Sequence, residues 1–336
     1  MKKCMMMLLV WAIAVGFACA NGNKENAVDK PIVLQIGFEN AMYEPVGQAV
    51  QRWQELLEKE SKGTMKLEIY PDSQLGSKNK LIDSMLLGEP VITIAEGSFY
   101  AEYGVPDFGI LVAPFLFDDW AQCWKLIDSS WYSEQCKKLE KKGLKILTSN
   151  WIYGERHTLT VKPVNKVEDL KGMKIRVPNN KIQTIGMNVL GCTATGMSLG
   201  DVYQALQTKT IDGAENPLST LYGRKLHEVA KYLVLDGHVK MPVSWVTSKH
   251  FFDRLSKEQQ QLLISTGNKA GLYNNECQKN ADNEYLDKMV KEGCVVKRLS
   301  AAELAAFKTR AQSFYGHWKE FNWSEGLYDT VLKAMK

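Results

Sequence analysis

The hydrophobic pattern near the start of the chain alternates between two periods. Residues 32–37 form an apolar run bounded by proline and glycine, and residues 65–70 alternate apolar and polar side chains, so both predict strands. Between them, the apolar positions of residues 46–57 fall on one helical face, and residues 80–87 predict a further helix. Residues 91–95 are apolar enough for a central strand. This alternation predicts parallel strands joined by helical crossovers.

A second set of elements follows at a distance along the chain. We expect strands at residues 144–147, 158–161 and 174–177, an aromatic-polar turn at 150–154, helices at 181–190 and 199–207, and extended chain at 237–248. From Ser256 the pattern is mostly helical, with a late strand at 294–298. Two α/β sets linked by extended crossings predict two lobes around a cleft, where a small ligand is expected to bind.

Residues 1–20 differ from the rest of the chain. Two lysines precede a short apolar run at residues 5–17, and small residues follow, which together describe an export signal. Cleavage after Ala20 and lipidation of Cys19 both fit this segment, and residues 21–30 then form a polar tether. No later segment reaches the ~18 uninterrupted apolar residues of a membrane-spanning helix.

Composition and motifs argue against several functions. The 42 basic and 38 acidic residues give a net charge of +4, too small and too scattered an excess for a nucleic-acid binder. The sequence has no G-x-S-x-G, H-E-x-x-H, Walker or G-x-G-x-x-G motif, and its five histidines lie far apart. Its cysteines show no metal-binding spacing. We therefore expect no enzyme, no metal and no other cofactor.

Residues 171–178 place an arginine where an anion can bind. The apolar residues of this stretch alternate, so Lys174 and Arg176 share the opposite face, and Pro178 puts Arg176 near the carboxyl end of the strand. Ligands of open α/β sheets collect at that edge, and arginine offers a planar fork to a carboxylate. The alternative is structural, an ion pair with Glu168, Asp169 or Asp212.

Residues 210–217 form a second unusual stretch. An Asp-Gly pair predicts a turn, and Asn216 before Pro217 is held in an extended exit. Asn216 can then offer a donor and an acceptor to a ligand, or it can bond to its own backbone in the turn. Among the histidines, His157 has the one noteworthy neighbour, Arg156.

Six motifs follow one another in order along the chain. They are Y-P-D-S-Q-L-G at 70–76, P-F-L-F at 114–117, G-E-R at 154–156, D-L-K-G-M-K-I-R at 169–176, V-Y-Q-A-L-Q at 202–207 and I-D-G-A-E-N-P at 211–217. Together they resemble the DctP-type substrate-binding proteins of tripartite ATP-independent periplasmic (TRAP) transporters. The resemblance covers nearly all of the chain after the tether.

The resemblance implies an α/β fold of the two-lobe periplasmic binding protein type, class II-like, with the ligand cleft between the lobes. It also implies a long helix late in the chain that braces both lobes. We expect the first lobe to comprise residues 31–152 plus 242–281, and the second to comprise residues 153–241 plus 282–336.

Several residues are expected to contact the ligand. Arg176 would bind its carboxylate, and Glu96 and His157 would meet hydroxyl groups. Trp151 is a candidate aromatic wall, because Glu155 stands where relatives often carry an aromatic residue. The full set implied for the cleft is Arg176, Arg156, Asn216, Glu96, His157 and Trp151.

The resemblance also implies the partners. A small organic acid, favoured to be a sugar acid such as a uronate or an aldonate, would be captured in the periplasm and delivered to the TRAP membrane subunits. C4-dicarboxylates and keto acids are alternative ligands, and presentation of the ligand to a sensor is an alternative role.

Overall fold

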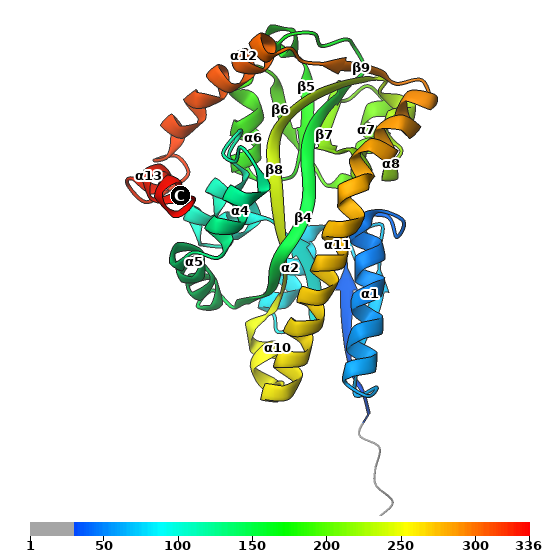
Figure 1. The fold of residues 1–336 in the computed structure, drawn as a ribbon, viewed down its shortest axis with the longest axis vertical. Coiled ribbons are helices and arrows are strands. Elements are labelled where there is room, and N and C mark those ends of the chain that lie inside the picture. Colours follow the sequence, from blue (N-terminus) through cyan, green and yellow to red (C-terminus); the bar gives the residue numbers. More distant parts are fainter. Residues whose placement is uncertain (1–29) are drawn as a thin grey trace, which may run out of the picture. The chain divides into compact units, whose positions relative to one another are not determined.

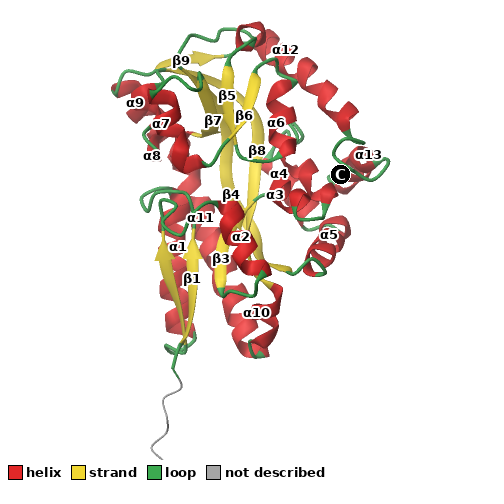
Figure 2. Ribbon diagram, turned by 180° about the vertical axis from the view of Figure 1, so that it is seen from behind, coloured by secondary structure: helices red, strands yellow, loops and turns green. Residues whose placement is uncertain are grey.

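One mixed sheet of nine strands runs through the residues that the computed structural model describes, 30–336 (Figures 1 and 2). The strand order is β2-β1-β3-β8-β4-β7-β5-β6, and β9 pairs with β8 off this path. The strands are β1 (Ile32–Gly37), β2 (Met65–Tyr70), β3 (Val91–Ala95), β4 (Leu144–Thr160), β5 (Lys174–Val177), β6 (Thr193–Gly196), β7 (Gly213–Pro217), β8 (Tyr232–Ser248) and β9 (Val295–Arg298). The expected export signal, with Cys19, and the tether up to residue 29 lie outside the described residues.

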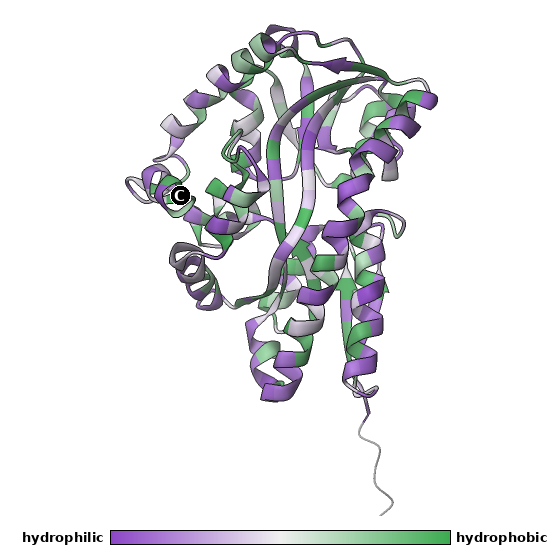
Figure 3. Ribbon diagram, viewed as in Figure 1, coloured by the Kyte–Doolittle hydropathy of each residue, from purple (hydrophilic) through white to green (hydrophobic). Residues whose placement is uncertain are grey.

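Helices connect and cover these strands. The α-helices are α1 (Pro45–Glu60), α2 (Lys78–Leu86), α3 (Gly97–Glu102), α4 (Trp120–Ile127), α5 (Ser130–Glu140), α6 (Lys181–Asn188), α7 (Val202–Gln207), α8 (Leu218–Gly223), α9 (Leu226–Val229), α10 (Lys249–Arg254), α11 (Lys257–Lys291), α12 (Ala301–Ala311) and α13 (Leu327–Ala334). Short 3-10 helices are η1 (Pro106–Val112), η2 (Val167–Leu170), η3 (Leu199–Asp201) and η4 (Gln312–His317). In Figure 3, strand β1 is mostly hydrophobic, whereas the long helices alternate hydrophilic and hydrophobic residues as surface helices do.

Two 17-residue strands, β4 and β8, connect the two ends of the sheet. They are antiparallel and pair from Leu144 with Ser248 to Thr160 with Tyr232. At one end β3 pairs with β8 and leads to the parallel strands β1 and β2, which we call the first lobe. At the other end β7 pairs with β4 and leads to β5 and β6, the second lobe. The predicted two-lobe α/β architecture is confirmed.

Strand β4 differs from its sequence prediction. The pattern predicts two short strands separated by a turn at residues 150–154, but the structure has one continuous strand. The register against β8 shifts four times along β4, and Gly154 adopts a φ of 134°. Such bulges interrupt the alternation of side chains. The stretch therefore resembles a turn in sequence, although β8 pairs with it.

The expected long helix is α11, which lies along β4 and α1 (Figure 1). It spans 35 residues and begins with a capping box between Ser256 and Gln259. Two glycines allow the helix to approach the first lobe closely. An added Cβ would lie 2.7 Å from the ring of Trp53 at Gly267, and 2.7 Å from Nε1 of Trp151 at Gly271.

Trp151 belongs to the core of the first lobe. Its ring is 0% exposed and its centroid lies 6.2 Å from that of Trp53 and 5.3 Å from that of Trp245. Its backbone position on β4 turns the indole toward α11, where Gly271 makes room for it. The structure therefore places Trp151 against α11 in this core, and its role as a wall of the ligand cleft stays a prediction.

Replacing Gly267 with alanine is expected to lower the free energy of unfolding by about 1–3 kcal/mol, because the new methyl group overpacks the tryptophan cluster. This cost exceeds the ~1 kcal/mol that alanine gains in a helix. Trp53 cannot move away easily, because it is fully buried and its Nε1 donates to Thr266 Oγ1 at 3.1 Å. Urea unfolding followed by tryptophan fluorescence measures the change.

Gly316→Ala is the matched control for that substitution. Nothing lies within 4 Å of the Cβ position at Gly316, so no loss of stability is expected there. Equal stability of Gly267→Ala and the parent protein would contradict the close packing of α11.

Each lobe has its own hydrophobic core, and the C-terminal segment joins the first. Phe314, Phe321 and Trp323 pack in the cluster that contains the β1 and β3 side chains. The second lobe holds two smaller clusters, around Leu159 and around Ile175. After α12 the chain thus packs against the first-lobe core, although the expected bounds give all of residues 282–336 to the second lobe.

Candidate functional site

Arg176 lies on β5 in fully buried surroundings. Its neighbours Ile175 and Val177 are 0% exposed, and Arg176 itself is 2% exposed. Its Nε and Nη2 donate to the carbonyl oxygen of Met197 at 2.8 and 2.6 Å, which holds one edge of the guanidinium in place. Within residues 30–336, no carboxylate lies at ion-pair distance from Arg176, unlike the buried Arg156.

The acids weighed as structural partners of Arg176 are engaged elsewhere. Glu168 faces Arg310 at 3.5 Å, and Asp169 and Asp212 accept backbone N–H groups. Burial lowers the pKa of Arg176, and the more distant carboxylates of the site offset this only in part. A buried cation without a counter-ion is costly, so this position favours the arrival of an anion.

Arg156, in contrast, already has a carboxylate partner. Its Nη2 donates to Glu215 Oε1 at 2.7 Å and to the Glu215 backbone oxygen at 2.8 Å, and its Nε donates to Oε2. The two residues come together because β4 and β7 are adjacent strands. Burial would raise the pKa of Glu215, but Arg156 and His238 outweigh burial and lower it. The planar fork of Arg156 thus binds Glu215 bidentately.

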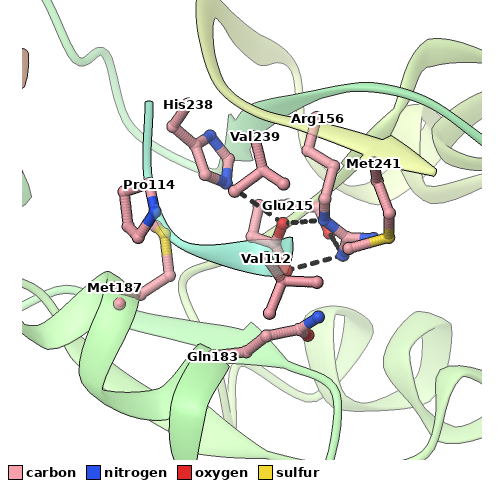
Figure 4. Close-up of a pocket in the computed structure, with 10 residues that line it drawn as sticks. Val112, Pro114, Arg156, Gln183, Met187, Glu215, His238, Val239 and Met241 are labelled. Atoms are coloured by element: carbon pink, nitrogen blue, oxygen red, sulfur yellow. Dashed lines mark hydrogen bonds and ion pairs between the residues drawn. The ribbon is translucent and has the colours of Figure 1, made fainter. Parts of the chain in front are cut away.

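A small cavity lies beside this ion pair, between the two lobes (Figure 4). Its polar lining consists of Arg156, Gln183, Glu215 and His238, and its apolar lining of Val112, Pro114, Met187, Val239 and Met241. The η1 segment supplies Val112 from the first lobe, and α6 supplies Gln183 and Met187 from the second. Figure 4 shows Arg156 and His238 directed at Glu215 from two neighbouring strands.

Asn216 follows Glu215 on β7 and is 2% exposed. Its Nδ2 is buried and has no hydrogen-bond partner among the described residues. The turn-bonded alternative for Asn216 is therefore not what the structure shows. Ser73 Oγ and Gln183 Oε1 are likewise buried without a partner. Unpaired buried polar atoms of this kind are rare, and they are ready to bond to a ligand or to water.

Glu96 lies at the end of β3, as the sequence predicts, and is 3% exposed. One oxygen accepts from Lys78 Nζ at 2.7 Å, and the other lies 3.4 Å from Gln183 Nε2. Glu96 therefore connects the first lobe to α6 of the second lobe. Burial would lower the pKa of Lys78, but Glu96, Glu39 and Tyr153 together outweigh burial and raise it.

His157 follows Arg156 on β4. It lies at the register shift of β4 between Arg156 and Thr158, and its side chain meets other partners than that of Arg156. His157 Nδ1 accepts the Gly237 N–H at 3.0 Å and lies 3.8 Å from Asp236 Oδ1. His157 thus bonds within the protein, opposite Asn216 on β7, and its contact with ligand hydroxyls stays a prediction.

The sequence patterns missed Lys78, Glu215 and His238. Glu215 lies within the Asn216 motif, so the motif itself could have drawn attention to it. The contacts of Lys78 and His238 join segments far apart in the chain, and no local spacing reveals them.

Two lobes joined by long strands, with a buried unpaired arginine and unpaired polar atoms, define a two-lobe binding protein for a small anionic solute. The sequence matches the model of the bacterial extracellular solute-binding proteins, family 7 (DctP), over residues 36–321, and the chain belongs to this family. Members of this family serve TRAP transporters as solute-binding proteins. The predicted family is confirmed.

Individual relatives agree with this assignment. The chain is 33% identical over 264 residues to the 2,3-diketo-L-gulonate-binding periplasmic protein YiaO of Escherichia coli, covering 78% of this chain and 80% of that protein. A TRAP periplasmic solute-binding protein from Ochrobacterium anthropi with bound L-fuconate has a TM-score of 0.87 and 39% identity, covering 91% of this chain and all of that one. A TRAP periplasmic solute-binding protein from Actinobacillus succinogenes with bound L-galactonate has a TM-score of 0.85 and 34% identity, covering 90% of this chain and 99% of that one.

Two further features of residues 30–336 bear on function. None of the helices there is both long enough and apolar enough to cross a bilayer. The same residues contain no group of three or more His, Cys, Asp or Glu side chains placed to hold a metal ion.

Proposed function

We propose that this protein captures a hydroxylated sugar acid, such as an aldonate or a uronate, in the periplasm and delivers it to the membrane subunits of a TRAP transporter. Arg176 binds the single carboxylate of the ligand. The observation that carries the proposal is that Arg176, alone among the buried Lys and Arg side chains of residues 30–336, has no carboxylate partner.

The charge balance favours one carboxylate over two. Arg156 is neutralised by Glu215 and Lys78 by Glu96, so only the charge of Arg176 is left for the ligand. A C4-dicarboxylate would bring a second charge without a buried partner, which is costly. The unpaired amide and hydroxyl groups of Asn216, Gln183 and Ser73 suit the hydroxyls of a sugar acid instead.

The ligands of the relatives support this choice. L-Fuconate, L-galactonate and 2,3-diketo-L-gulonate, named for the three proteins described above, each carry one carboxylate on a hydroxylated chain. The unpaired groups come from both lobes, Ser73 from the first and Gln183 and Asn216 from the second, so a hydroxylated acid that reached both sets would bond to the two lobes at once. Ligand binding then stabilises the closed arrangement, which the membrane subunits recognise.

L-Fuconate and L-galactonate are expected to raise the melting temperature, because a ligand that binds the folded state alone stabilises it by ~2.7 kcal/mol at 100 times its Kd. For a chain of this size that corresponds to a shift of roughly 5 °C. Differential scanning fluorimetry with these acids, galacturonate, succinate and pyruvate measures it. A shift with succinate and none with any sugar acid would reject the proposed ligand class.

The proposed delivery requires export, which we assign to the N-terminal residues. Residues 1–20 direct export, and either cleavage after Ala20 or lipidation of Cys19 leaves residues 21–30 as a tether. Intact mass of the protein purified from its native envelope distinguishes a free Asn21 from a diacylated Cys19.

A further inference from the structure

His238, on β8, lies between two buried carboxylates. Its Nε2 is 3.2 Å from Glu215 Oε2, and its Nδ1 is 3.2 Å from Asp236 Oδ2. We propose that His238 is a positioning residue that remains an imidazolium, holds Glu215 in place for Arg156, and makes anion binding at Arg176 dependent on its proton. The ligand-binding part of this inference rests on the proposed function above.

Both ring nitrogens of His238 face a carboxylate: Nε2 is hydrogen-bonded to Glu215, and Nδ1 lies at ion-pair distance from Asp236 Oδ2 without a hydrogen bond to it. A neutral imidazole has one N–H, so its other nitrogen would direct a lone pair at a carboxylate. Asp236 is fixed as an acceptor, because the Thr158 N–H donates to Oδ1 at 3.1 Å and the Thr158 hydroxyl donates to Oδ2 at 2.7 Å. Glu215 is fixed in the same way by Arg156. An imidazolium donates to Glu215 through Nε2 and places its positive charge beside Asp236.

The electrostatics of the site agree with that geometry. Burial would lower the pKa of His238, but Asp236 and Glu215 outweigh burial and raise it to about 9. Burial would likewise raise the pKa of Asp236, and the neighbouring histidines instead hold it well below its usual range. Both shifts favour the charged forms.

Each element around His238 contributes known charges. Strand β4 contributes Arg156 and, beyond Asp236, His157; β7 contributes Glu215; and β8 contributes Asp236. The side chains that line the cavity from η1, the following loop and α6 carry no ionisable group: Val112, Pro114, Gln183 and Met187.

The proton on His238 changes the net charge that a ligand meets. With His238 charged, the two cations Arg156 and His238 balance the two carboxylates Glu215 and Asp236, and the nearby Arg176 supplies one further positive charge. Loss of the proton leaves the group around Glu215 with one negative charge, which opposes an anion at Arg176, and weakens the hold on Glu215. A carboxylate ligand therefore binds the protonated protein better, and its binding in turn favours the proton.

The direct test is the protonation state of His238 in the ligand-free protein. Nitrogen NMR of protein labelled with ¹⁵N-histidine, assigned by the signal lost in His238→Gln, is expected to show two protonated ring nitrogens at pH 7 and a titration well above pH 8. Asp236→Asn, which keeps the histidine, is expected to lower that titration by about one unit or more. A neutral His238 at pH 7 would overturn the proposal whether or not a sugar acid binds.

The linked test is affinity for L-galactonate against pH. Between pH 7 and 9.5 the parent protein is expected to lose on the order of tenfold in affinity, and His238→Gln to show weaker binding that varies much less with pH. His317→Gln, at an exposed histidine, keeps the parent profile. A parent affinity that stays constant over this range, with L-galactonate bound throughout, would overturn the linkage. If no sugar acid binds at all, the proposed function fails, and the NMR result alone decides the state of His238.

Discussion

Replacing Arg176 with lysine is expected to weaken sugar-acid binding by about 100-fold or more, since removing one partner of a buried hydrogen-bonded charge pair costs about 2–5 kcal/mol. Lysine keeps the positive charge but lacks the planar fork. It also cannot keep both bonds to the Met197 carbonyl while reaching the ligand. Isothermal titration with L-fuconate or L-galactonate measures the loss.

The control for this substitution is Arg52→Lys. Arg52 is an exposed arginine whose side chain pairs with Glu55 at 3.1 Å on the surface of α1, and its replacement should leave binding unchanged. Circular dichroism of Arg176→Lys should match that of the parent protein. Affinity within about twofold of the parent would reject Arg176 as the carboxylate anchor, since a lost bidentate bond costs more than that.

Local sequence patterns were sufficient for the main features of Arg176. The alternation in residues 173–177 and the position of Pro178 indicate a strand with an arginine near its end. What the pattern could not decide was whether a carboxylate of the protein neutralises it. That depends on where Glu168, Asp169 and Asp212 find their own partners, which only the packed structure determines.

For Arg156, in contrast, the sequence did not reveal the ion pair with Glu215. Sequence reasoning placed Arg156 and Asn216 in one cleft, which stays a prediction: in the pairing of β4 with β7, Arg156 lies opposite Pro217 and Asn216 lies opposite His157. It treated Glu215 as part of a motif and missed that its carboxylate binds Arg156. Arg156 and Glu215 are 59 residues apart in the sequence, so their contact leaves no recognisable pattern in either segment.

The fold was predictable where the hydrophobic period is regular. The alternation of β1, α1, β2, α2 and β3 follows from local pattern alone. Strand β4 was not predictable as one continuous strand, because its bulges and Gly154 interrupt the alternation of apolar and polar residues. The return of the C-terminal aromatic residues to the first lobe was missed for another reason: amphipathic helices show which face is buried, but not against which partner.

Replacing Glu215 with glutamine is expected to lower the free energy of unfolding by about 3–5 kcal/mol, because breaking a buried ion pair leaves an uncompensated charge in the interior. Here two cations, Arg156 and His238, lose their common partner Glu215, and both cations are 2% exposed. Urea unfolding at pH 7 measures the loss. Glu55→Gln, at the exposed pair with Arg52, should cost less than about 1 kcal/mol.

The pH dependence of that loss separates the two cations. The folded-state pKa of His238 is raised to about 9, so its stabilisation is complete below its unfolded pKa and is lost as pH rises through about 9. The cost of Glu215→Gln should therefore be smaller at pH 9.5 than at pH 7, since Arg156 is then the one cation that loses an attraction to Glu215. An equal cost at both pH values would assign the stabilisation to Arg156 alone, and a cost below about 1 kcal/mol at pH 7 would mean that water reaches the pair and screens it.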